Sequence, residues 1–352
     1  MIEEYDIEKK IKKKRSKRIS FLNRDACTVF KGQYYLPWFW NINNTKESES
    51  EVTVFKIPEK VVVFDLDETL GCFGDLFILW SGIRNICPHF ERFDDLFDLY
   101  PEFLRYGIIT ILEYLYKKKL QKECHKIMVY TNNQCTGDWV KLVTKHIEHR
   151  VHTQYSKQSK STKHKKNETL FDQLICAFRI NNKPIEIKRS SHRKTMSDLL
   201  NCTVLTRDVE ICFVDDVEHN EMKSSRVYYI CPLPYYHTLT AQQVVSRFMD
   251  SNIFSSTKWK HTLLYSKDFW VSWFSSYKRA FEHKRMSYSD LKDDLIVPKK
   301  LMIHLQEFMQ WKRNPPKYDS NKKGKTQKKW NAQKKRDKWK KQKTKKQRLS
   351  RK

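Results

Sequence analysis

Two aspartates and a threonine at alternate positions form the first pattern in this sequence that could do chemistry. Asp65, Asp67 and Thr69 directly follow the apolar run 61–64, which predicts a buried strand of a parallel sheet. Open α/β sheets bind ligands at the carboxyl ends of such strands. Two carboxylates this close repel each other, so they need a cation or a shared proton. A solvated acidic turn would explain one aspartate but not the whole pattern.

Two further apolar runs, 127–130 and 211–214, also end in polar side chains and predict two more strands. The polar groups after these strands, with a lysine between them along the chain, are Thr131, Asn132, Lys194, Asp215 and Asp216. The ends of parallel strands lie at one edge of the sheet, so we expect these groups to meet there.

Together these side chains form a set suited to phosphate chemistry. Carboxylate oxygens are the ligands that Mg²⁺ prefers. The metal and Lys194 would offset the charge of a phosphoryl group and of an approaching carboxylate. The hydroxyl of Thr131 and backbone N–H groups at 131–132 could bind the remaining phosphate oxygens.

The order of these motifs resembles the haloacid dehalogenase superfamily. The string DLDETL (65–70) is similar to the small C-terminal-domain phosphatases, the NLI-interacting-factor-like family. The segments RYGIITILEYL (105–115) and KTMSDLL (194–200) agree with two other stretches of that family. The resemblance covers about residues 58–250 and implies a Rossmann-like α/β fold with a parallel sheet of haloacid dehalogenase type.

The resemblance also implies roles for the motif residues. Asp65 would be the nucleophile that becomes an aspartyl-phosphate, and Asp67 would protonate the leaving group and then activate water. Lys194 would pair with Asp65 and with the phosphoryl oxygens. Thr69 would orient the loop, and Thr131 and Asn132 would bind phosphate. Mg²⁺ would be bound by Asp65, Asp215 and the backbone carbonyl of Asp67. Asp216 would lie behind these metal ligands.

The implied reaction is Mg²⁺-dependent hydrolysis of phosphoserine or phosphothreonine in proteins, such as the repeat tail of RNA polymerase II. We expect no separately folded cap domain, and an open site suits protein-bound phosphates. The sequence departs from the family at Gly71, at Tyr106 and in a basic insert at 155–168. Three other basic residues compete with Lys194 for its role: Lys188, Arg189 and Arg193. An alternative to an active enzyme is an inactive scaffold.

Basic residues are concentrated near the two ends of the chain. Residues 312–352 carry 20 Lys or Arg and two Asp, so +18 of the formal net charge of +28 lies there. A second basic run occupies 9–18. Trp330 and Trp339 among the C-terminal lysines allow stacking on bases, so a nucleic-acid-binding factor, or a phosphatase acting on nucleic-acid ends, is the alternative function. A localisation signal or an electrostatic tether would have the same composition.

The expected organisation has four parts. Residues 1–57 form a basic arm with an aromatic lead-in, 58–254 the phosphatase-like domain, 255–314 a helical extension, and 315–352 a disordered Lys-rich tail.

Within these parts the sequence predicts elements by period and composition. We expect helices at 107–119 and 138–149 and several helices after 241, and strands at 174–180 and 227–231. Residues 72–104 show no clear period and are expected to form a loop and flap beside the acidic site. His146, His149 and His152 are expected to lie exposed on a helix rather than to bind a metal.

Nine scattered cysteines without a CxxC pair indicate reduced thiols in the nucleus or the cytoplasm. No apolar run approaches the ~18 residues of a membrane span, so we expect no membrane partner. The sequence does not determine the oligomeric state.

Overall fold

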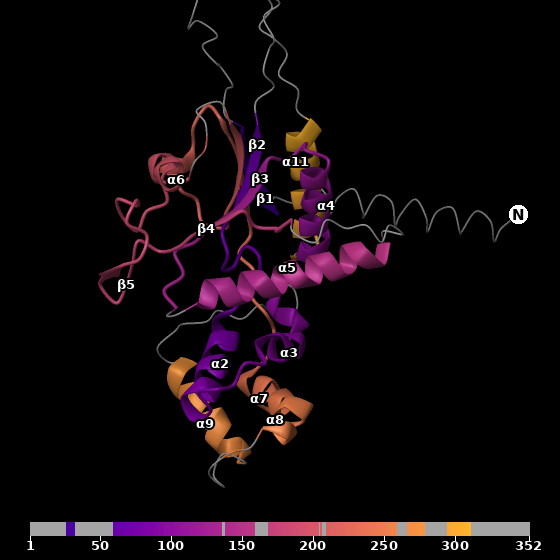
Figure 1. Cartoon of the computed structure of the whole chain (residues 1–352), viewed down its shortest axis with the longest axis vertical. Coiled ribbons are helices and arrows are strands. Elements are labelled where there is room, and N and C mark those ends of the chain that lie inside the picture. Colours follow the sequence, from indigo (N-terminus) through magenta and orange to yellow (C-terminus); the bar gives the residue numbers. More distant parts are fainter. Residues whose placement is uncertain are drawn as a thin grey trace, which may run out of the picture. The chain divides into compact units, whose positions relative to one another are not determined.

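A six-stranded, mostly parallel β-sheet forms the centre of the structure, a computed structural model (Figure 1). The strand order is β1-β8-β7-β2-β3-β4. Among the described strands of this sheet, only β1 runs antiparallel to its neighbour. The predicted α/β architecture with a parallel sheet is confirmed, and it is compatible with a Rossmann-like fold.

The structure describes residues 26–31, 59–135, 138–158, 168–203, 205, 209–257, 259, 266–278 and 294–310. The strands are β1 (Cys27–Lys31), β2 (Lys60–Phe64), β3 (Lys126–Tyr130), β4 (Gln173–Ile175), β5 (Arg179–Ile180), β6 (Lys183–Pro184), β7 (Glu210–Val214) and β8 (Val227–Pro232). The helices are α2 (Gly74–Ile86), α3 (Phe93–Asp98), α4 (Ile108–Leu120), α5 (Trp139–Gln158), α6 (Met196–Cys202), α7 (Ala241–Met249), α8 (Asn252–Ser256), α9 (Lys267–Lys278) and α11 (Val297–Gln310), with short 3-10 turns at Pro101–Phe103 and Asn220–Met222. The predictions for the basic N-terminal run and for the tail fall outside these residues.

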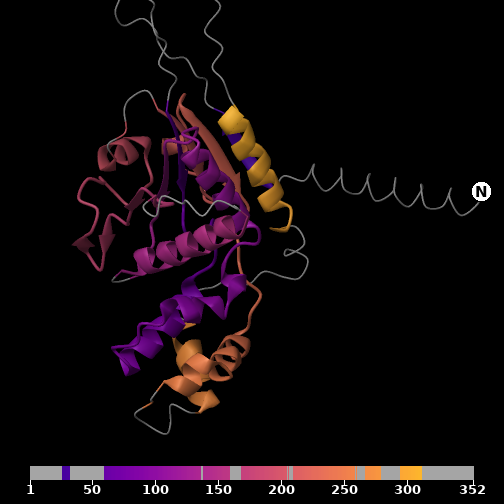
Figure 2. The same cartoon turned by 45° about the vertical axis from the view of Figure 1, so that its right-hand side comes forward.

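Apolar strands place the core on both faces of the sheet. Every residue of β2 and β7 is buried, as expected for parallel strands covered on both sides. One face packs under α6, where Leu199 and Cys202 join alternate residues of the central strands. Helices α4 and α11 lie on the opposite face (Figures 1 and 2). The described residues up to Met309 form one compact unit.

Residues 72–104 form α2, α3 and a 3-10 turn joined by short loops, so the expectation of a loop and flap was wrong. Helices α2 and α3 gather with α7, α8 and α9 (Figure 2). Edge-to-face aromatic contacts join these helices. The rings of Phe248 in α7 and Trp270 in α9 lie 5.3 Å apart, and those of Phe93 in α3 and Trp139 in α5 lie 5.6 Å apart. Arg247 ties α7 to the turn before α4 through Glu102, with N–O distances of 2.8 and 2.9 Å. The side chains of α2 and α3 are buried against segments that are distant in the sequence. The local hydrophobic periodicity of residues 72–104 therefore does not reveal these helices.

Three other boundaries differ from expectation. Helix α5 continues to Gln158 and takes in the start of the 155–168 insert, because Gln154 donates to Glu113 of α4 at 2.6 Å. The predicted strand 174–180 ends at Ile175. The chain then forms a hairpin whose two loop residues, Asn181 and Asn182, adopt φ of 48° and 61°. The edge strand β1 was not expected, because its residues are only partly buried and are ordered by pairing with β8.

The helices expected after residue 241 are confirmed. Helix α7 begins with a capping box between Thr240 and Gln243. In α11, Leu301, Leu305 and Phe308 are fully buried. No helix among the described residues is long and apolar enough to cross a membrane. All nine cysteines lie within the described residues and are unpaired.

His146 is buried, so the expectation that it lies exposed was wrong. Its ring stacks on Phe97 with centroids 4.2 Å apart, and its Nδ1 lies 2.8 Å from Asp94 Oδ1. Burial lowers the pKa of His146, and the contacts with Asp94 and Asp98 offset this only in part. The imidazole is therefore part of the aromatic core around α3 and α5.

We predict that this histidine makes stability fall in acid. The unfolded chain has the higher histidine pKa, so it binds the proton first as the pH drops below about 6.5, and the free energy of unfolding decreases. In His146→Gln this part of the pH dependence should disappear. Urea unfolding from about pH 7.5 to about pH 5 measures it. His149→Gln, at an exposed position of the same helix, is the control; equal pH dependence in all three proteins would contradict the prediction.

Candidate active site

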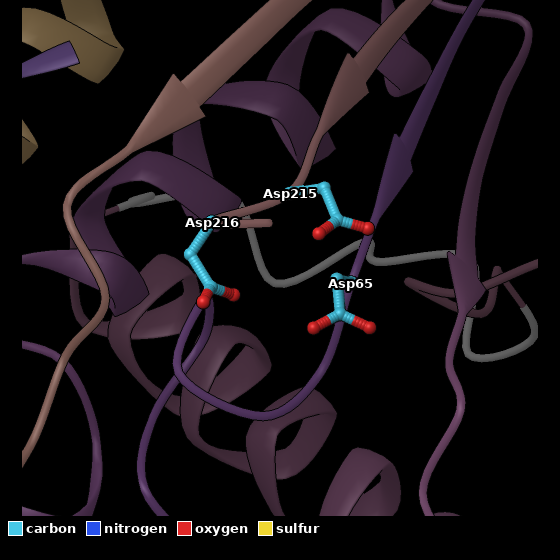
Figure 3. Close-up of side chains that lie close together, drawn as sticks. All are labelled: Asp65, Asp215 and Asp216. Carbon is cyan, nitrogen blue, oxygen red and sulfur yellow. The ribbon is translucent and has the colours of Figure 1, made fainter. Parts of the chain in front are cut away.

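The three strand ends predicted from the sequence meet at one edge of the sheet. Strand β2 pairs in parallel with β3 and β7, with Phe64 opposite both Val129 and Val214. The ladder continues one residue further, since the Asp65 N–H donates to the Val214 carbonyl at 2.8 Å. Asp65 and Asp215 therefore emerge side by side, with Asp216 facing the same space (Figure 3).

Lys194 supplies the cation between these carboxylates. Its ammonium donates to Asp65 Oδ1 and, at 2.7 Å, to Asp215 Oδ2, and the lysine is 2% exposed. Of the competing basic residues, Lys188 and Arg193 are exposed, and Arg193 pairs with Glu221. The structure thus places Lys194, two residues before α6, at the position that the sequence assigned to it.

Charge is only partly balanced in this group. Burial, opposed by Lys194 and supported by Asp215, raises the pKa of Asp65 well above its usual range. Burial acts the same way on Asp215, but Lys194 and His219 outweigh it and lower the Asp215 pKa. The two carboxylates outweigh burial at Lys194 and raise its pKa. Lys194 therefore favours the ionised form of Asp215, while burial and the neighbouring carboxylate act against ionisation of Asp65.

The remaining acidic groups of the site also have raised pKa values. Burial raises the pKa of Asp216 to about 6 and that of Glu68 to about 8. Burial also raises the pKa of Asp67, while a hydrogen bond from Asn133 and the charge of Lys194 lower it.

The donor set fits a hard divalent cation. Asp65, Asp215 and Asp216 each offer an oxygen, and these oxygens lie within 4.8 Å of one another. Lys194 offsets only part of their charge, and a cation with oxygen ligands would offset the rest. The carboxylate of Asp67 is not in this group; it accepts from Asn133 Nδ2 at 2.7 Å. Asp216, expected behind the ligands, lies among the candidate ligands instead.

The loop after Asp65 has a fixed and unusual backbone. Glu68 adopts φ of 55°, and its N–H donates to the Gly71 carbonyl at 2.7 Å. A Cβ at Gly71 would lie 2.3 Å from the Phe103 carbonyl oxygen, which explains why a glycine stands at this position. The Thr69 hydroxyl donates to Asp216 Oδ1 at 2.8 Å and accepts from the Asp216 N–H at 3.0 Å.

Thr131 and Asn132 also lie at this edge, and a buried arginine orders them. The Arg189 guanidinium donates to the Thr131 carbonyl at 3.0 Å and to Asn132 Oδ1 at 2.6 Å, and it lies over the Tyr130 ring. The Thr131 hydroxyl accepts from the Asn133 N–H at 3.0 Å. Arg189 therefore shapes the loop after β3 instead of replacing Lys194.

Sequence reasoning missed three residues that position the predicted groups: Arg105, Asn133 and Arg189. Arg105 begins the segment RYGIITILEYL, and Asn133 directly follows Thr131 and Asn132, but their partners lie far away along the chain. Arg189 was considered only as a rival for the lysine. The sequence signal that could have identified these three residues was that each lies next to, or within a few positions of, a motif residue.

Comparisons with protein-family models, with curated proteins and with solved structures found no match to this chain.

We predict that Lys194→Met destabilises the fold most at neutral pH. The variant keeps the aliphatic length but leaves two buried carboxylates unpaired, which costs about 3–5 kcal/mol. Without the cation their pKa values in the folded state rise above those of the unfolded chain, so the folded state gains protons and relative stability as the pH falls. Urea unfolding at about pH 7.5 and about pH 5 should show the larger loss at the higher pH.

The exposed Lys188→Met is the matched control and should unfold like the wild type. A loss of stability in Lys194→Met that is the same at both pH values would show that packing, not charge, explains the effect.

Proposed function

We propose that this chain is a Mg²⁺-dependent phosphatase of haloacid dehalogenase type that hydrolyses phosphoserine or phosphothreonine in proteins. The observation that carries the proposal is Lys194 between Asp65 and Asp215, with Asp67 two residues beyond the first carboxylate. A buried lysine–dicarboxylate group at the carboxyl ends of parallel strands suits a reaction in which a carboxylate meets a dianionic phosphoryl group.

In this mechanism Asp65 is the nucleophile. A carboxylate oxygen of Asp65 forms a bond to phosphorus while the bond from phosphorus to the serine or threonine oxygen breaks. Lys194 lowers the repulsion between the two anions. Asp67, whose pKa is raised by burial, delivers a proton to the departing alkoxide. Asp67 then accepts a proton from water, which attacks phosphorus and restores the Asp65 carboxylate.

Three neighbouring groups hold Asp67 and the phosphate in place. Asn133 fixes the Asp67 carboxylate, and the Thr69–Asp216 hydrogen bonds fix the loop that carries it. Thr131 and the backbone N–H of Asn132 bind phosphate oxygens in the proposed complex. Asp65, Asp215 and Asp216, with the Asp67 carbonyl, would hold Mg²⁺. The cation would supply further compensation of the phosphoryl charge.

The proposed substrate is a phosphorylated protein segment, on two grounds. The motif resemblance is to protein phosphatases. The hairpin that precedes Arg189 and the turn that follows it also expose basic side chains that would attract an acidic segment: Arg179, Lys183, Lys188 and Arg193. Action in the nucleus or the cytoplasm remains part of the proposal.

The first test is hydrolysis of p-nitrophenyl phosphate by the full chain with and without Mg²⁺. We expect turnover that requires the metal and falls by roughly 10³-fold or more in Asp65→Asn, because the amide cannot form the acyl-phosphate. Asp95→Asn, at an exposed position on α3, is the control with unchanged turnover.

Phosphoserine peptides are assayed in parallel with this substrate. If the wild type turns over neither substrate with Mg²⁺, the phosphatase proposal fails. Turnover that persists in Asp65→Asn would exclude this aspartate as the nucleophile.

A second prediction concerns the protonation of Asp67. Asn133→Ala removes a hydrogen bond that lowers the Asp67 pKa, so this pKa rises and the acid stays protonated to higher pH. The falling, alkaline side of the kcat/KM profile should move to higher pH for a phosphoserine peptide, whose alkoxide needs a proton. It should move little for p-nitrophenyl phosphate, whose leaving group needs none. Gln134→Ala is the control, and an alkaline side that stays in place for the peptide would contradict the role of Asp67.

The alternative function is nucleic-acid binding through the Lys-rich C-terminal residues. These residues lie outside the described part of the chain, so this function stays a prediction. Deleting residues 315–352 separates the two ideas. Loss of nucleic-acid binding with full activity on phosphopeptide would make the tail accessory. An inactive scaffold would show neither hydrolysis nor metal dependence.

A further inference from the structure

Arg105 holds the backbone of the loop that carries Asp67. This arginine is 1% exposed. Its Nε donates to the Thr69 carbonyl at 2.8 Å, and its Nη2 donates to the Glu68 and Leu233 carbonyls. The Arg105 N–H donates to the Leu70 carbonyl at 3.0 Å. One side chain thus fixes two consecutive peptide groups directly after Asp67, at the point where the backbone adopts its positive φ.

The counter-charge for Arg105 comes from the far end of the described chain. Asp294, three residues before α11, accepts from Arg105 Nη1 at 2.8 Å and is 2% exposed. Among the described residues this is the ion pair that Arg105 makes. Burial lowers the pKa of Arg105, and Asp294 is the strongest influence that opposes this change. The cation that organises the loop therefore depends on a carboxylate 189 residues away.

The segment 294–310 is itself attached to the core at both ends. At its start, Pro298 lies against the turn after Arg105: a Cβ at Gly107 would lie 3.0 Å from Pro298 Cβ. At its end, Lys60 at the start of β2 donates to the Phe308 and Met309 carbonyls at 2.7 Å each. Between these points Leu301, Leu305 and Phe308 are fully buried. Asp294 is therefore held in place by a helix packed on the sheet.

We propose that Asp294 is a positioning residue for the phosphatase reaction, acting through Arg105 on the Glu68 and Thr69 peptide groups and so on Asp67. The C-terminal segment 294–310 then belongs to the working site, although the sequence motifs end well before it. Thr69 links the same loop to Asp216, so a shift of these peptide groups also moves a candidate metal ligand. The kinetic part of this inference rests on the proposed function; the structural part does not.

The test uses the full-length Asp294→Asn protein, which keeps the size of the side chain but removes its charge. We expect kcat on a phosphoserine peptide, whose alkoxide needs a proton, to fall on the order of 10- to 100-fold, because a displaced general acid costs this much, while KM changes by less than about threefold. Hydrogen exchange followed by mass spectrometry should show the amides of residues 66–71 exchanging roughly tenfold faster, with the strands β2 and β7 unchanged.

Glu307→Gln is the matched control. Glu307 is also a carboxylate of this segment, but its partners are Lys31 and the Tyr228 hydroxyl, and its side chain is 48% exposed. Both kcat and the exchange of residues 66–71 should stay at the wild-type level.

Two results would overturn the inference. One is a folded Asp294→Asn protein with wild-type kcat and wild-type exchange in residues 66–71. The other is faster exchange spread evenly over the whole sheet, which would indicate general destabilisation. If Asp294→Asn does not fold, Arg105→Lys replaces it: the amine can still pair with Asp294 but cannot bind both carbonyls, so the same local changes are expected. If the wild type shows no phosphatase activity, the proposed function fails while the exchange measurement still decides the positioning role.

Discussion

The site depends on compensating buried negative charge at the carboxyl ends of β2 and β7. Asp65 and Asp215 are brought together because their strands pair in parallel, and removing them from water would be prohibitive without a partner. Lys194 provides one positive charge from the turn before α6. Three features keep this group of charges in place. They are the hydrogen-bonded loop after β2, the Arg105 side chain that binds this loop, and the ordered loop after β3.

Much of this arrangement was predictable from the sequence, because buried parallel strands are recognisable as short apolar runs. The runs before Asp65, Thr131 and Asp215 predict the strands, and the parallel sheet then brings their ends together. The prediction that Lys194 is the cation came from the order and spacing of the motifs and from the resemblance of KTMSDLL, and the structure brings its ammonium to both carboxylates. The activity inferred from these motifs stays a proposal.

The residues that sequence reasoning missed share a physical reason. Asn133 reaches Asp67 across 66 positions, and Arg105 reaches the Glu68 carbonyl across 37 positions. Such hydrogen bonds exist only after folding and leave no periodic trace. The same reason applies to α2 and α3, whose aromatic side chains Phe77 and Phe93 pack on Trp139 of α5. Helix α2 also lies against α9. Strand β1 likewise owes its conformation to the edge of β8.

The unpaired cysteines have a practical consequence. The thiolate is the form that reacts with alkylating agents and oxidants, and burial suppresses it. Burial raises the pKa of Cys27, Cys124 and Cys135 to about 12. These sulfur atoms are therefore chemically quiet in the native protein but would react normally once the surrounding segment opens. Their alkylation rates therefore report which of these segments open first.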